Sequence, residues 1–249
     1  MSIVISQQST WPVQVVDYLD RNHLKFIGWE TSGVDRVSAY VYDHAILEFR
    51  SLLKEFSLIG YHCTKLTHYE IEDIRKNGMK LQCGESLRQR VLRLESAQEI
   101  ERAVSQKLLA RNQADDSNRA FMLWFCFFEP HLAGFYGIHR FFKSWGGEAL
   151  YNSHENQKIT GDALKEIGIP CVIKANVAIS SLKASYYPCS ALIRSYLQER
   201  GYLISNSIEH EGYSTEDISS NQIEAIYLHP SDEFIQLTKC NEWSGELAL

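Results

Sequence analysis

The stretch SLIGYHCTKLTHYEIEDIRKNGMKL, residues 57–81, decides the fold of this chain. It opens with an apolar run that predicts a short buried strand carrying His62 near its end. Thr67 and Glu70 have the spacing of a capping box, which predicts that a helix begins there. Gly78 is the residue type that ends a helix in the left-handed conformation. The stretch therefore predicts a strand, a capped helix and a glycine that returns the chain to the core.

The segments around this unit have a helical pattern. Residues 1–56 are expected to form a helical N-terminal lobe, and residues 57–249 a second domain that contains a charged helical insert at 85–113. The insert holds one helix or two, because Ser96 and Glu99 offer a further capping box. Its arginines and lysines form either a solvated helix face or a basic surface that approaches phosphates.

Further strands are predicted in the second half of the chain. The apolar run at 119–128 is typical of a strand buried on both faces, and residues 223–228 and 234–237 read as two closing strands. Helices stand between some of these strands, without the regular alternation of a doubly wound sheet. The order of elements therefore predicts an α+β fold.

Composition excludes several classes of protein. The chain has 249 residues, of which 45% are hydrophobic and 22% charged, the values of a globular protein. No apolar run is long enough for a transmembrane helix, and the first residues lack the pattern of a secretion signal. We therefore expect a cytoplasmic protein with no membrane partner. The net charge of −6 argues against a non-specific nucleic-acid coat but not against a local basic groove.

Several chemistries lack their sequence motifs. There is no phosphate-binding glycine loop, no nucleophile elbow and no zinc-protease motif. The six cysteines are scattered without a C-x-x-C pair, so reduced thiols are favoured over disulfides. No histidine stands at ligand spacing beside a cysteine, and we expect no metal.

Two other segments combine aromatic, glycine and charged residues. The first, YGIHRFFKSWGGEALY at 136–151, joins two aromatic clusters through a pair of glycines. The second, EHEGY at 209–213, precedes the apolar strand that begins at Ile223. Glu211 stands twelve residues before Ile223, and Glu209 stands fourteen before it.

These three segments, in this order, resemble the motifs of ADP-ribosyltransferases. In that superfamily a strand ends in H-x-T before a helix, an aromatic motif follows, and a glutamate precedes a closing strand of pattern I-x-x-I. The resemblance covers about 57–237 and implies an ADP-ribosyltransferase-like split β-sheet core. It implies NAD as the substrate, without a metal. Where the family carries a tyrosine on its second strand, this chain has Trp124 and Phe125.

The resemblance also assigns roles to residues. A carboxylate that holds the ribose 2′-hydroxyl stabilises the positive charge that develops when nicotinamide leaves, and Glu211 is the candidate, with Glu209 as its rival. An aromatic face attracts the cationic nicotinamide ring, and an arginine pairs with pyrophosphate. Arg140 has an ion pair with Glu148 or another acid as its alternative. The predicted NAD-binding residues are His62, Thr64, Tyr136, Arg140 and Tyr151.

The resemblance to intracellular enzymes of this superfamily implies that the chain is a toxin of a toxin–antitoxin or anti-phage system. It also implies a protein antitoxin as its partner. The acceptor of ADP-ribose is a nucleic acid or a protein, and the basic insert favours a nucleic acid. Two alternatives stay open. One is an RNA 2′-phosphotransferase-like enzyme of the same fold, which the acidic composition disfavours. The other is a binding module without catalysis.

Overall fold

The computed structural model describes residues 2–31, 36–245 and 248–249. Its strands are β1 (Ser2–Ile3), β2 (Ser57–Leu66), β3 (Leu123–Cys126), β4 (Ile169–Ala178), β5 (Glu211–Ser214) and β6 (Ile223–Leu228). Its helices are α1 (Val13–Glu30), α2 (Ala39–Leu53), α3 (His68–Asn77), α4 (Gly84–Ser96), α5 (Arg102–Ala110), α6 (Phe135–Lys143), α7 (Glu148–His154), α8 (Lys158–Glu166), α9 (Cys189–Glu199) and α10 (Asp232–Thr238).

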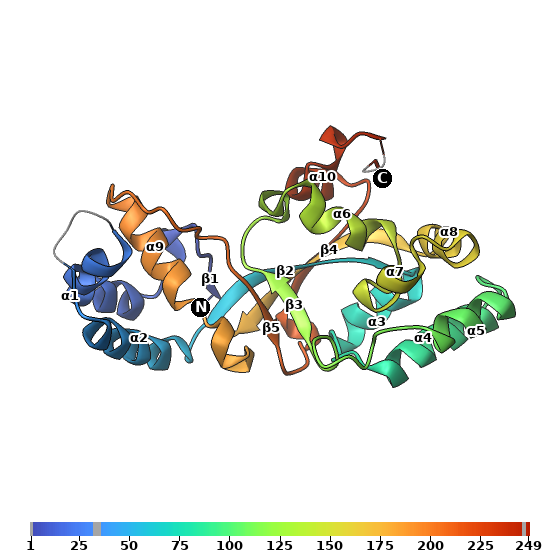
Figure 1. The fold of residues 1–249 in the computed structure, drawn as a ribbon, viewed down its shortest axis with the longest axis horizontal. Helices are drawn as coiled ribbons and strands as arrows, with labels where there is room; N and C mark the ends of the chain where they lie inside the picture. Colours follow the sequence, from blue (N-terminus) through green and yellow to red (C-terminus); the bar gives the residue numbers. More distant parts are fainter. Residues whose placement is uncertain (1, 32–35, 246–247) are drawn as a thin grey trace. The chain divides into compact units, whose positions relative to one another are not determined.

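The strands form one open sheet in the order β5-β3-β2-β4-β6, and β1 pairs with the beginning of β2 (Figure 1). The β1–β2 pair is parallel, with Ser2 opposite Ser57. The β4–β6 pair is antiparallel, with Val172 opposite Tyr227. An open sheet with antiparallel pairing and interspersed helices confirms the predicted α+β class.

The chain forms two compact units. Unit 1 comprises residues 1–60, 126–128 and 176–213, and unit 2 comprises 61–125, 129–175 and 214–249. Strands β2 and β4 each contribute residues to both units. The helical segment 1–56 is thus joined in unit 1 by residues that lie much later in the chain.

In unit 1, α9 packs against both α1 and α2. The ring of Tyr18 on α1 stacks on Phe49 of α2 with centroids 5.2 Å apart. Glu30 at the end of α1 is buried and accepts hydrogen bonds from Tyr42 at 2.7 Å and from Arg194 of α9 at 2.8 Å. The carboxylate is therefore compensated by partners from both neighbouring helices.

In unit 2, the charged insert forms two helices, α4 and α5, rather than one. Ser96 is the last residue of α4 and donates its hydroxyl hydrogen to the Leu92 carbonyl, so it does not cap α5, which begins after Glu101. The inward faces of both helices join a core with α7 and α8 around the fully buried Trp145. The insert is therefore an integral part of this core.

The stretch that decides the fold has the predicted local structure. Thr67 Oγ1 accepts from the Glu70 N–H at 3.2 Å, and the Glu70 carboxylate accepts from the Thr67 N–H at 2.8 Å, which confirms the capping box. Gly78 has φ of +78°, and a Cβ there would come within 2.0 Å of the Ile218 carbonyl oxygen. Only glycine meets both requirements.

Two strand predictions are wrong. Residues 234–237 belong to helix α10, because the Ser231 side chain accepts from the Phe234 N–H and caps a helix whose first turn carries two acids. The strand predicted over 119–128 is limited to β3. Phe121, two residues before β3, has a positive φ, so the extended backbone does not reach it. Trp124 is 38% exposed, so the strand is not buried on both faces.

Candidate functional site

His62 lies on β2 in unit 2 and is half-buried. Its Nδ1 is 2.8 Å from the carbonyl oxygen of Trp124 on β3. A carbonyl oxygen can only accept, so Nδ1 carries the proton and Nε2 is left as an acceptor when the ring is neutral. The ring of Phe125 lies beside it, with centroids 5.9 Å apart. The imidazole is thus held in one tautomer, with an acceptor suited to a ligand hydroxyl group.

The surroundings of His62 favour the neutral ring. Burial lowers the pKa of His62, and the positive charge of Arg90 lowers it further, while the hydrogen bond to the Trp124 carbonyl opposes both. The pKa stays below its ordinary value of 6.5. At neutral pH the residue therefore accepts a hydrogen bond and carries no charge.

Arg90 is itself held by contacts with Glu70 and Trp145. Its Nε donates to Glu70 Oε1 at 2.5 Å, and its guanidinium lies 4.6 Å from the ring centroid of Trp145. The indole N–H of Trp145 donates to Glu70 Oε2 at 2.9 Å. Burial opposes the charge of Glu70, but Arg90 and the hydrogen bonds hold the pKa of this carboxyl below its usual range. The glutamate that caps α3 therefore also ties α3 to α4 and to Trp145.

Tyr151 and Arg140 are in direct contact with one another. The Arg140 guanidinium is 4.1 Å from the ring centroid of Tyr151, and Phe141 meets the same ring edge-on. Arg140 makes two hydrogen bonds to Glu155, at 2.6 and 3.1 Å. The ion pair that the sequence left open is thus made with Glu155. Tyr151 is buried, and its hydroxyl lies 3.3 Å from Glu148.

The other two residues predicted to bind NAD are placed differently. Thr64 is half-buried on β2, two residues beyond His62, and so lies on the same face of the strand. Tyr136 lies in the first turn of α6 with 83% of its surface exposed, and its ring meets His139 edge-on at 6.0 Å. Its ring is therefore accessible for stacking.

Glu211 belongs to unit 1, where it is the first residue of β5 and is exposed. Glu209 is exposed as well, two residues earlier. The side chain between them, His210, points the other way: it hydrogen-bonds the Tyr186 carbonyl at 2.8 Å and stacks on Phe127. Both carboxylates are thus presented to solvent, and neither is distinguished from the other by its contacts.

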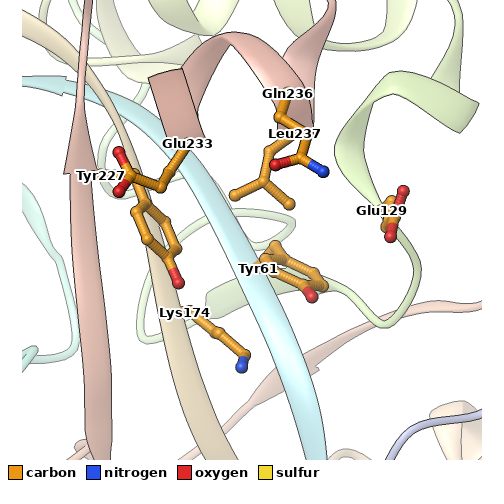
Figure 2. Close-up of a pocket in the computed structure, with 7 residues that line it drawn as sticks. All are labelled: Tyr61, Glu129, Lys174, Tyr227, Glu233, Gln236 and Leu237. Atoms are coloured by element: carbon orange, nitrogen blue, oxygen red, sulfur yellow. The ribbon is translucent and has the colours of Figure 1, made fainter. Parts of the chain in front are cut away.

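A pocket of about 190 Å³ lies elsewhere in unit 2 (Figure 2). Lys174 of β4 extends into it, and its Nζ pairs with Glu224 at 2.8 Å. The hydroxyl of Tyr227 points toward Lys174. The remaining lining residues come from β2, from the segment after β3 and from α10; they are Tyr61, Glu129, Glu233, Gln236 and Leu237. The lining thus combines two phenol rings, one ammonium group and two carboxylates.

Tyr61 and Lys174 both keep their protons at neutral pH. Burial raises the pKa of Tyr61 above its ordinary value, and Lys174 opposes this only in part. The hydrogen bond to Glu224 raises the pKa of Lys174 despite burial. None of the residues predicted for NAD binding or catalysis lines this pocket. Its members are far apart in the sequence, and no motif joins them, so sequence reasoning had no signal for it.

Comparisons with protein-family models, with curated proteins and with solved structures give no match. Among the described residues, no group of three His, Cys, Asp or Glu side chains could hold a metal ion. Across the same ranges, none of the helices combines the length and apolar character needed to cross a membrane.

Proposed function

We propose that this protein transfers ADP-ribose from NAD to a macromolecule. The observation that carries the proposal is His62: a half-buried imidazole on the predicted H-x-T strand, fixed in the Nδ1–H tautomer, with Nε2 as an acceptor. A neutral acceptor of this kind matches a ribose hydroxyl of NAD. The capped helix α3 and Gly78, which the resemblance requires after that strand, support the same assignment.

In the proposed reaction the bond between ribose C1′ and the nicotinamide nitrogen breaks, and its electron pair leaves with neutral nicotinamide. C1′ forms a new bond to a nucleophile of the acceptor, which gives up a proton. Positive charge builds on the ribose between these events, and a carboxylate near the 2′-hydroxyl stabilises it. The proposal gives this role to Glu211, which is exposed at the start of β5. Modification of an essential macromolecule would make the chain toxic to its own cell, and this is the reason to expect a protein antitoxin.

The test uses NAD labelled in its adenine moiety, incubated with the full chain and with total RNA, DNA or protein. Label should enter one acceptor class. His62→Ala should weaken NAD binding by about tenfold, the value of one lost hydrogen bond, whereas His68→Ala, an exposed histidine on α3, should leave it unchanged. Glu211→Gln should keep NAD affinity and lower single-turnover transfer by roughly 10²–10³-fold.

The variants also define what would contradict the proposal. A large loss in Glu209→Gln with normal transfer in Glu211→Gln would move the carboxylate role to Glu209. NAD binding that depends on His62 without any transfer would leave a binding module. If the wild-type chain neither binds NAD nor labels any acceptor, the proposed function is wrong.

A further inference from the structure

A second pocket of unit 2, about 470 Å³ in volume, lies where α5 packs against α8. We call it the basic groove and define it by Lys107 and Arg111 at the end of α5, by His154 of α7, and by Lys158, Ile159 and Thr160 in the first turn of α8. All of these residues belong to unit 2.

The groove carries three positive charges that are not compensated locally. Lys107, Arg111 and Lys158 are exposed, and the residues that line the groove include no aspartate or glutamate. Within the ranges that the structure describes, none of these three side chains makes an ion pair. The whole chain has a net charge of −6, so this is a local concentration of charge opposite in sign to that of the molecule.

Helix stability does not explain the position of Lys158. It is the first residue of α8, and that first turn contains no acidic residue. A cation at the beginning of a helix is repelled by the partial positive charge of the helix end, whereas Lys107 at the end of α5 is favourably placed. The sequence therefore places a third cation beside the other two at a position that folding disfavours.

A buried histidine bridges the two sides of the groove. His154 is only 3% exposed, and its Nε2 lies 2.6 Å from the Arg111 carbonyl oxygen while its Nδ1 lies 3.0 Å from Thr160 Oγ1. These two hydrogen bonds join the end of α5 to the first turn of α8, the two segments that carry the three cations. Ile159 has 59% of its surface exposed and gives the groove an apolar contact.

We propose that the basic groove binds a single-stranded nucleic acid, with the cations on phosphates and Ile159 against a sugar or base. A positively charged groove that follows the phosphate backbone is how proteins hold a single strand without reading its sequence. An acidic peptide would match the same charges, and competition by polyglutamate tests for it in the experiment below. The inference rests on the proposed function for the role of the bound strand, which would be the acceptor of ADP-ribose. Binding itself needs no NAD.

The experiment measures binding of a dye-labelled 12-nucleotide DNA and RNA of mixed sequence to the full chain by fluorescence anisotropy, without NAD. Three phosphate contacts predict a slope of about −2 for log affinity against log salt concentration. The triple variant Lys107→Glu, Arg111→Glu, Lys158→Glu should lose affinity by roughly 10²-fold. Lys54→Glu, Lys76→Glu and Lys183→Glu together make the same charge change at exposed lysines elsewhere and should lose less than about threefold.

A milder variant, Lys107→Gln with Lys158→Gln, guards against misfolding of the triple variant and should reduce the salt slope by about 1.4. Three results would each overturn the inference. They are equal losses of affinity in the two triple variants, no binding by the wild-type chain at 50 mM salt, and polyglutamate that displaces the labelled strand as well as an unlabelled oligonucleotide does. The two proposals fail separately. A strand-binding chain that transfers no ADP-ribose contradicts only the proposed function, and a chain that transfers without binding strands contradicts only the groove.

Discussion

Adjacent residues of β2, Tyr61 and His62, point to opposite faces of the strand and have very different surroundings. Around His62 the polar atoms are fixed: Nδ1 is bonded to a carbonyl, and Arg90 is held by Glu70, whose side chain is 13% exposed. Around Tyr61 the charged groups line an open pocket, and its one lysine has a partly exposed partner (Figure 2). The surroundings of His62 suit a precise contact with one ligand group, whereas the pocket beside Tyr61 should tolerate substitution of its charged residues.

The largest expected effect tests the closed network. Glu70→Ala removes one of the two hydrogen bonds of the capping box and leaves the Arg90 Nε and the Trp145 indole N–H without their acceptor, so the free energy of unfolding should fall by about 3 kcal/mol in urea denaturation. Glu72→Ala, on the same helix and exposed, should change it by less than about 0.5 kcal/mol. Equal losses in the two variants would show that the network does not hold this side of β2.

The next effect concerns pH and His62. Its pKa in the folded chain lies below 6.5, so the unfolded chain takes up the proton first, and folding stability should fall as the pH drops from 6.5 toward the folded pKa. Nε2 stops accepting once protonated. NAD affinity should therefore stay constant from pH 8 to 6.5 and decline below the folded pKa, levelling off at a loss of about tenfold, the same as in His62→Ala.

Calorimetric NAD titrations and ring-proton NMR of His62 measure both quantities. His68→Ala should keep the wild-type pH profile. A histidine that titrates above 6.5, or an NAD affinity that changes steadily between pH 8 and 6.5, would contradict the fixed neutral imidazole.

The smallest effect is expected in the open pocket. Lys174→Met breaks the ion pair with Glu224, whose two side chains are 29% and 33% exposed, and should cost less than about 1 kcal/mol of unfolding free energy. The cost should shrink further in high salt, because partly exposed pairs are screened. Denaturation in 0.05 M and 0.5 M sodium chloride checks this. A loss as large as that of Glu70→Ala would remove the contrast between the two sides of β2.

Local signals explain which parts of the fold could be predicted. The capping box at Thr67 and the glycine at 78 involve residues that are close together in the sequence. The residues that form the pattern are therefore the same ones that make the contacts in the structure. The run from Phe234 to Leu237 has an apolar character that strands share with helices, and the Ser231 cap, which lies outside that run, decides for the helix.

The sites depended on longer-range information. The helical spacing of Leu87 and Val91 predicts an inward face, but the partner of that face, Trp145, is known only from the tertiary structure. The pocket in Figure 2 and the basic groove are likewise assembled from distant segments. For His62 the motif identified the residue, and only the Trp124 carbonyl showed which ring nitrogen remains as an acceptor.

Unit 1 is assembled from segments that the ribosome synthesises at different times. Helices α1 and α2 leave the ribosome long before α9, which packs against both of them. Until α9 follows, Glu30 has no Arg194 to compensate its charge, and the surface of α1 and α2 that α9 covers stays exposed. We therefore expect a product terminated before Cys189 to aggregate more readily than the full chain, because this surface has no cover.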